Sequence, residues 1–207
     1  MEHKRNFARQ RRPAFRLRFP EARIEHWASR FSDSIEGDFE LEIPRRIRTQ
    51  GYLEKRDFLR LCRWKSPRSR PHVEKNPASF IEAVTGTAFS TSDERLRIEV
   101  LTLLDGVDWP TASVILHFGH RDPYPILDVR ALWSFGIEEP PNYGFEFWWA
   151  YTLACRRVAR RNGCTMRALD RALWQYSKER QRPAAARRRP RGPRPPSNTD
   201  RILRADR

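Results

Sequence analysis

The sequence is poor in cysteine and contains no long run of apolar residues. Its 207 residues include three cysteines, Cys62, Cys155 and Cys164. An odd number at such wide spacing excludes a disulfide framework and a standard zinc site, and favours a reducing compartment. No apolar stretch approaches the roughly 18 residues of a membrane span, and the basic N-terminus lacks the apolar segment of a secretory signal. We therefore expect a cytoplasmic protein without a membrane anchor.

Strand-like alternation is also scarce, and apolar residues recur at helical spacing instead. The chain is 39% hydrophobic, with seven Trp and twelve Phe, which is enough for the core of one domain. The segment 76–86 has Asn76 as a possible cap, Pro77 in the first turn and Gly86 as a possible end. Thr91 and Glu94 have the spacing of a capping box. The fold predicted is all-α, with helices at 21–31, 54–63, 76–86, 91–104, 145–153 and 166–176.

The net charge of +15 is concentrated at the two ends. Residues 1–18 carry a net charge of +6 and residues 180–207 a net charge of +8, which leaves +1 for the body at 19–179. We predict a basic N-terminal tail over 1–18, a helical domain over 19–179 and a disordered Arg/Pro-rich tail over 180–207. Such tails attract nucleic acid without sequence preference, or they only solubilise the protein.

The stretch "LLDGVDWPTASVIL" (103–116) predicts the end of one helix, a tight turn and the start of a second helix. Gly106 permits a positive φ and the close approach of another chain, and Val107 can point inward. The backbone N–H groups near Thr111 and Ala112 would favour an anion such as a phosphate. The alternative is an ordinary helical hairpin in which Gly106 only ends the first helix.

A loop containing Gly119, Pro123 and Pro125 follows, and Asp128 then opens another helix in "HFGHRDPYPILDVRALW" (117–133). Together with the turn, this arrangement resembles the helix-hairpin-helix DNA glycosylase superfamily of the endonuclease III type. That family carries a hairpin of the form L-x-G-V-G-x-K-T-A and an Asp at a helix start. "LDGVDWPTA" aligns with it without gaps over 104–112, and Asp128 lies eighteen residues after Pro110. The specific match covers roughly residues 94–136.

The resemblance implies that double-stranded DNA is the partner and that a flipped-out base is excised. Asp128, as a carboxylate, would stabilise the cationic sugar that develops as the base leaves and would help to activate a water. The alternative role for Asp128 is that of a helix N-cap, for which Asp is among the best residues. One side chain can fill both roles.

Three departures limit what the resemblance implies. Pro110 stands at the lysine position of lyase-type members, so no Schiff base can form there and an intact abasic site is expected. Asp108 replaces the second glycine of the hairpin, where its charge would repel a phosphate unless it caps the following helix. The four-cysteine cluster of several relatives is absent, so we expect no iron–sulfur cluster and no other cofactor.

Several other residues have side chains that suit DNA contacts or metal ligands. Trp64, Lys65 and Arg68 suit either a nucleic-acid groove or an ordinary helix end, and no feature singles out Lys65 as a catalytic amine. His117, His120 and Asp122 lack a further ligand for a metal site, and Trp133 and Phe135 are expected in the core. Arg130 is expected to pair with an acid that the sequence does not identify. The arginines at 156, 157, 160 and 161 share one helical face that is either a phosphate-binding patch or a solvated side. The candidate DNA-binding residues are Leu104, Gly106, Val107, Trp109, Thr111, Ala112, Arg156 and Arg160.

The leading hypothesis is therefore a monomeric, monofunctional DNA glycosylase-like protein with Asp128 as its catalytic carboxylate. The first alternative is a non-catalytic nucleic-acid-binding module of the same fold, which Pro110 and Asp108 would allow. The second is an interaction protein whose nearly neutral body never meets nucleic acid.

Overall fold

The structure is a computed structural model that describes residues 15–32, 39–138 and 142–181. These residues form helices and connecting segments without a β-strand, which confirms the all-α class. Among them, no helix combines the length and the apolar character needed to cross a bilayer. Most of the two predicted tails, residues 1–14 and 182–207, lies outside the described part. The elements are η1 (Glu21–Arg23), α1 (Ile24–Ser29), α2 (Phe39–Gln50), α3 (Lys55–Lys65), η2 (Pro67–Ser69), α4 (Arg70–Val73), α5 (Ala78–Ser90), α6 (Glu94–Glu99), η3 (Val100–Leu103), α7 (Trp109–Gly119), α8 (Val129–Ser134), α9 (Phe145–Arg161) and α10 (Met166–Arg180).

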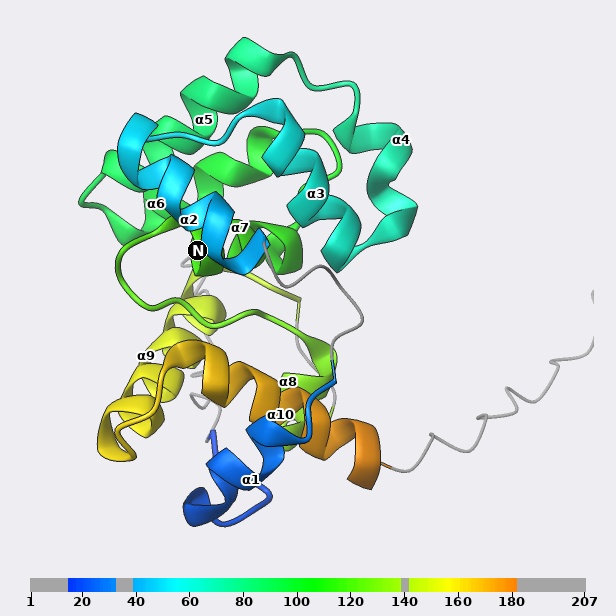
Figure 1. The fold of residues 1–207 in the computed structure, drawn as a ribbon, viewed down its shortest axis with the longest axis vertical. Helices are drawn as coiled ribbons and strands as arrows, with labels where there is room; N and C mark the ends of the chain where they lie inside the picture. Colours follow the sequence, from blue (N-terminus) through cyan, green and yellow to red (C-terminus); the bar gives the residue numbers. More distant parts are fainter. Residues whose placement is uncertain (1–14, 33–38, 139–141, 182–207) are drawn as a thin grey trace, which may run out of the picture.

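The helices form two groups, which Figure 1 shows one above the other. The helices α2 to α7 make the first group, in which α3 and α2 pack on α7. The second group contains α1, α8, α9 and α10, and both α1 and α8 pack along α10. The segment 120–128 leads from α7 in the first group to α8 in the second. A residue in this segment can therefore meet side chains from both groups.

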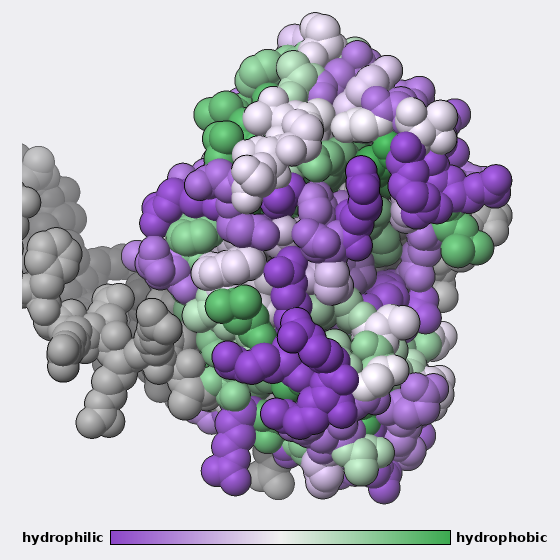
Figure 2. Space-filling model, turned by 90° about the vertical axis from the view of Figure 1, so that its left-hand side faces the viewer, coloured by the Kyte–Doolittle hydropathy of each residue, from purple (hydrophilic) through white to green (hydrophobic). Residues whose placement is uncertain are grey.

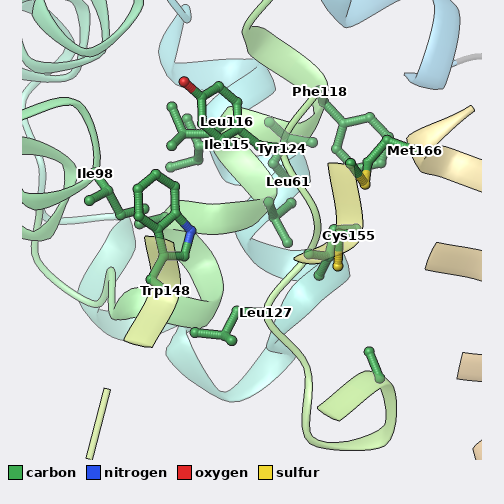
Figure 3. Packing of buried hydrophobic residues seen from close by; sticks show 14 of the residues in the cluster. Leu61, Ile98, Ile115, Leu116, Phe118, Tyr124, Leu127, Trp148, Cys155 and Met166 are labelled. Atoms are coloured by element: carbon green, nitrogen blue, oxygen red, sulfur yellow. The ribbon is translucent and has the colours of Figure 1, made fainter. Parts of the chain in front are cut away.

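A continuous apolar core joins the two groups. Trp148 of α9 is fully buried and stacks on Tyr124 of the connecting segment, with the ring centroids 5.7 Å apart. Figure 3 shows these rings beside Leu61 of α3 and Ile98 of α6. Burying side chains of this size contributes roughly 1.5–3 kcal/mol each, which makes helix packing the main source of stability. The predicted core position of Phe135 is confirmed, whereas Trp133 is half-buried and stacks on Tyr176.

The face carrying α6 and α9 is mostly hydrophilic (Figure 2). Hydrophobic side chains appear on this face only in small separate groups. Exposed Leu96 of α6 and Leu153 of α9 are among the exposed large apolar residues of the chain. Single apolar side chains of this kind are ordinary on a protein surface and do not by themselves indicate a partner.

The helix predicted over 76–86 is present, but its caps differ from the prediction. α5 begins at Ala78 and continues past Gly86 to Ser90. Asn76 does not cap it, because its side chain bonds the turn at Asp105: Nδ2 donates to the Asp105 carbonyl (3.0 Å) and Oδ1 accepts from the Asp105 N–H (2.8 Å). A long-range pair of hydrogen bonds therefore replaces the expected local cap.

The N-cap of α6 and the N-terminal boundary also differ from the prediction. Asp93, rather than Thr91, caps α6 by accepting from the Leu96 N–H at 2.7 Å. Residues 15–18, which were assigned to the basic tail, pack on the body. The Arg16 N–H donates to the Phe135 carbonyl (3.1 Å) and the Arg18 N–H to the Ser134 carbonyl (2.9 Å). The packed part of the chain thus begins before residue 19.

Candidate active site

A cavity of about 320 Å³ lies between the two helical groups. The first group contributes the end of α3, and the second contributes the start of α8 and one face of α10. The residues just after α1 complete the wall. The lining residues are Phe31, Ser32, Trp64, Lys65, Ile126, Asp128, Arg167, Asp170, Trp174 and Lys178.

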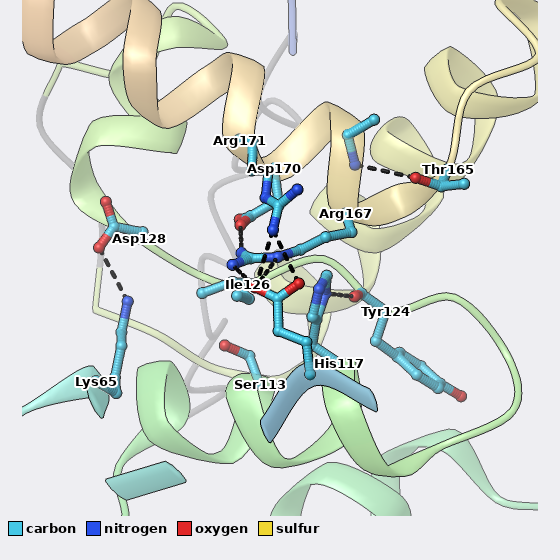
Figure 4. A network of polar contacts seen from close by, with 12 residues as sticks. Lys65, Ser113, His117, Tyr124, Ile126, Asp128, Thr165, Arg167, Asp170 and Arg171 are labelled. Carbon is cyan, nitrogen blue, oxygen red and sulfur yellow. Dashed lines mark hydrogen bonds and ion pairs between the residues drawn. The ribbon is translucent and has the colours of Figure 1, made fainter. Parts of the chain in front are cut away.

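Asp128 caps α8 and faces this cavity at the same time. Its Oδ1 accepts a hydrogen bond from the Arg130 N–H at 2.9 Å, which is an N-cap contact. Its Oδ2 accepts from Lys65 Nζ at 2.9 Å (Figure 4), and 23% of the side chain is exposed. Burial alone would raise the pKa of this carboxyl, but the Lys65 ammonium and the N–H groups of Arg130 and Ala131 hold the pKa below its ordinary value. The Asp128 side chain is therefore an anion at neutral pH.

The segment before Asp128 is anchored on α7 and α9. The Leu127 N–H donates to Ser113 Oγ of α7 at 2.8 Å, and the Tyr151 hydroxyl of α9 donates to the Ile126 carbonyl at 3.2 Å. His117 Nδ1 lies 2.7 Å from the Tyr124 carbonyl. Burial lowers the pKa of His117 to about 4, so the imidazole is neutral and can donate this hydrogen bond. These contacts fix the position from which the Asp128 side chain extends.

Lys65 is the last residue of α3, and only 12% of its side chain is exposed. Its position in "CRWKSPRSR" gave no reason to single it out, because its partner Asp128 lies 63 residues further along the chain. The packing of α3 on α7 brings the two together. The structure thus adds an amine to the carboxylate that the sequence identified.

A second carboxyl, Asp170 of α10, lines the same cavity and is 8% exposed. Its Oδ2 accepts from Arg167 at 2.8 Å, while Arg167 also bonds Glu40 of α2, which in turn pairs with Arg171 (Figure 4). The pKa of Asp170 is raised to about 6, because burial and the nearby charge of Asp128 raise it more than the charges of Arg167 and Lys65 lower it. The two carboxyls of the cavity therefore differ in proton affinity.

Sequence inspection missed this face of α10, although a signal was present. Arg167, Asp170, Trp174 and Lys178 recur at intervals of three and four residues, so one helical face carries all of them. Such a face is equally typical of a solvated helix surface. Only the packing of α10 opposite α3 makes it a cavity wall.

Aromatic rings form the remaining walls of the cavity. Phe31 meets Trp174 edge to face, with ring centroids 5.3 Å apart. The Arg167 guanidinium lies 5.6 Å from the Trp64 ring centroid. Lys178 and Arg130 lie 5.1 and 5.4 Å from the Trp174 ring centroid, so Arg130 contacts an aromatic face rather than the expected acid. A flat ring can enter between such walls, and the cations nearby favour an electron-rich or anionic ligand.

The turn at 104–108 has the predicted backbone. Gly106 has φ +76°, and Val107 is buried. A Cβ atom added to Gly106 would lie 2.9 Å from His72 Cβ and 3.0 Å from Val73 Cγ1. The absence of a Cβ atom at Gly106 therefore makes room for α4 of the same chain, which packs against the turn.

The backbone amides of Thr111 and Ala112, which were expected to favour an anion, have hydrogen-bond partners within the chain. Asp108 is the N-cap of α7, and its Oδ1 accepts from the Thr111 N–H at 3.0 Å. The Ala112 N–H donates to the Asp108 carbonyl at 2.8 Å, and both residues are buried together with Leu104. The carboxylate of Asp108 thus lies where a phosphate was expected, because it accepts the hydrogen bond of a free N–H group in the first turn of α7.

The arginines of α9 do not act as one patch. Arg156 donates from Nε to the Pro123 carbonyl at 2.8 Å and stacks over Tyr124, with its Cζ 4.5 Å from the ring centroid. Arg161 pairs with Glu21, whereas Arg157 and Arg160 are exposed. Arg156 is thus a structural contact of the connecting segment, and Arg160 keeps its place as a candidate phosphate contact.

The remaining candidates have structural partners. Trp109 is half-buried and packs near Trp148, with centroids 6.5 Å apart. His120 lies 2.6 Å from Arg97, and its Nδ1 accepts from the Asp122 N–H at 3.0 Å. Within the described ranges, no three His, Cys, Asp or Glu side chains are grouped so as to hold a metal ion.

Comparison of the chain with protein-family models, with curated proteins and with solved structures gives no match. Function is therefore inferred from the cavity, its two carboxyls, its amine and its aromatic walls.

Proposed function

We propose that the protein cleaves the N-glycosidic bond of a base in DNA, with Asp128 as the carboxylate that stabilises the sugar cation. The observation that carries this proposal is the position of Asp128: an ionised, partly exposed carboxylate in an aromatic-walled cavity. A cavity of about 320 Å³ is large enough for a single base.

The chemistry follows from where charge develops. When the bond between the sugar and the base breaks, its electron pair leaves with the base and positive charge appears at the anomeric carbon. A fixed carboxylate beside this carbon lowers the energy of the transition state, and its effect is larger where water is excluded. Trp64 and Trp174 offer aromatic faces to a base that has left the duplex.

The resemblance to helix-hairpin-helix glycosylases supports the same function. In that comparison the turn at 104–108, between η3 and α7, corresponds to the family's hairpin, and Asp128 to its catalytic aspartate. Because Asp108 occupies the amide of Thr111, we assign the phosphate contacts to exposed Arg160 and to Lys178 at the cavity, with the basic tails adding nonspecific affinity.

The test uses duplexes that contain uracil, alkylated, oxidised or mismatched bases and measures the abasic sites formed. Asp128→Asn keeps the size of the side chain and removes the charge, and we expect it to slow base release by at least about 100-fold. Asp122→Asn, in an exposed part of the connecting segment, is the matched control and should retain activity. Undiminished release by Asp128→Asn contradicts the proposal. Salt-dependent binding without any product would instead favour a non-catalytic DNA-binding module.

A second activity at the same cavity is cleavage of the DNA strand at the abasic site, and the 2.9 Å contact between Lys65 and Asp128 favours it. Once the Lys65 ammonium has released a proton to water, the free amine can attack the aldehyde carbon of an abasic sugar, while Asp128 stays an anion beside it. Loss of water gives an imine, and loss of a proton from the neighbouring carbon expels the 3′ phosphate. Pro110 excludes such an amine only at its own position.

Borohydride distinguishes the two activities, because it reduces an imine to a stable covalent adduct. An adduct between the protein and an abasic duplex that is lost in Lys65→Met, but not in Lys55→Met, would establish the lyase activity. Lys55 is the matched control, since it begins the same helix and bonds backbone carbonyls outside the cavity. Intact abasic product and no adduct would leave base excision alone.

A further inference from the structure

The cavity contains two carboxyls whose surroundings differ in a way that the resemblance does not describe. Asp128 has the ammonium of Lys65 at 2.9 Å and a backbone N–H donor at 2.9 Å. Asp170 has one side-chain donor, Arg167, which also bonds Glu40. Within the described residues, the second oxygen of Asp170 makes no hydrogen bond, and the side chain still lines the cavity.

We propose that Asp170 is the general base of this site: its carboxylate takes a proton from the water that attacks the sugar, while Asp128 stays ionised beside the developing cation. This inference rests on the proposed base excision and divides its work between two residues. The resemblance would give both tasks to the aspartate at position 128.

The proton balance explains why the tasks separate. The water oxygen forms a bond to the anomeric carbon, the bond from that carbon to the base breaks, and the electron pair leaves with the base. Asp170 takes one proton from the water and then releases it to the departing base anion, directly or through solvent, which regenerates the Asp170 carboxylate. A carboxylate that is stabilised as strongly as Asp128 is a weak base, whereas the better base is the carboxylate with fewer donors.

Charged and titratable groups around Asp170 come from four helices, α3, α8, α9 and α10 itself. They are Lys65 of α3 and Asp128 at the start of α8, Tyr151 and Cys155 of α9, and Arg167 of α10. Through Arg167, Glu40 of α2 and His117 of α7 also act on it. Burial raises the pKa of Tyr151 and of Cys155 well above neutral and lowers that of His117 to about 4. The pKa of Asp170 is raised to about 6, which lies within the range of pH 5 to 8.

The experiment measures single-turnover base release between pH 5 and 8, on the duplex from the panel that the wild type processes best. For the wild type we expect the rate to rise with pH, with a midpoint near 6, as Asp170 loses its proton. Asp170→Asn should slow release by about 100-fold or more and abolish this rise. Asp170→Glu should restore part of the rate together with the rise.

Asp57→Asn is the matched control, because Asp57 is another buried aspartate that pairs with an arginine, Arg46, outside the cavity. The Asp57→Asn variant should show the same pH dependence of base release as the wild type, even if its free energy of unfolding is lower. Binding of a duplex with a tetrahydrofuran abasic analogue should stay within about threefold for Asp170→Asn, which shows a folded site. If Asp170→Asn binds poorly, the pH profile of Asp170→Glu decides instead: a flat profile overturns the assignment.

The outcomes separate the inference from the proposed function. A wild type that releases no base overturns both. An active wild type together with an Asp170→Asn variant that keeps the rise near pH 6 overturns the assignment of Asp170 alone and returns the proton transfer to another group.

Discussion

Replacing Gly106 by Ala tests the packing of the turn at 104–108 against α4. Gly106 has φ +76°, in the left-handed region that an alanine occupies only at a cost of roughly 1–2 kcal/mol. The new Cβ would also lie 2.9 Å from His72 Cβ, 3.0 Å from Val73 Cγ1 and 3.2 Å from the Val73 backbone nitrogen. At least one group must move, because the 2.9 Å contact is shorter than two carbon atoms tolerate and the other two contacts are tighter than usual.

The expected magnitude is the sum of backbone strain and overpacking. Overpacking costs typically 1–3 kcal/mol, so Gly106→Ala should lower the free energy of unfolding by about 2–5 kcal/mol. Gly51→Ala separates the two contributions, since Gly51 has φ +83° and a Cβ there meets no atom within 4 Å. That variant should lose only about 1–2 kcal/mol. Both changes restrict the unfolded chain in the same way, which cancels in the comparison.

Urea unfolding followed by far-ultraviolet circular dichroism measures both variants against the wild type. Equal losses for Gly106→Ala and Gly51→Ala, within about 0.5 kcal/mol, would show that α4 does not press on the turn. The glycine would then serve its backbone conformation alone, and the turn could still accept a close approach from another molecule.

Two further predictions concern the connecting segment that carries Asp128. Burial lowers the pKa of His117 to about 4 in the folded protein, below its unfolded value near 6.5. The folded state therefore favours neutral His117. The stability that this provides is present at pH 7 and is lost as the pH falls from about 6.5 towards 4. Between pH 7 and pH 5 this loss amounts to about 2 kcal/mol. Urea unfolding at both pH values should therefore show a difference in the free energy of unfolding that is about 2 kcal/mol smaller in His117→Gln than in the wild type. An equal difference in the two proteins would mean that His117 is not buried as described. Arg156→Met removes the hydrogen bond to the Pro123 carbonyl and the contact with the Tyr124 ring. It should lower the free energy of unfolding by about 1–2 kcal/mol. Arg157 is exposed, so Arg157→Met should change the free energy of unfolding by less than about 0.5 kcal/mol. Equal effects of the two arginine changes would contradict the structural role of Arg156.

Several features of the fold could be predicted because they depend on neighbouring residues. Apolar spacing predicted the helices around Trp27, Phe58 and Leu169, since one face of a helix repeats every three or four residues. Gly106 marked the turn because few other residues accept its backbone angles, and Asp128 could be expected as a cap for α8. Helix ends were predicted less well: α5 passes Gly86, and Asn76 bonds Asp105 instead of capping the helix.

The amino-acid sequence by itself determined the helical class, the turn at Gly106 and the carboxylate at the start of α8, because each of these follows from local backbone preferences. Tertiary structure alone decided that Lys65 meets Asp128 and that Asp170 shares their cavity. Cavity walls come from segments far apart along the chain, and their proton affinities depend on burial and on which charges packing brings together. No local pattern encodes either quantity.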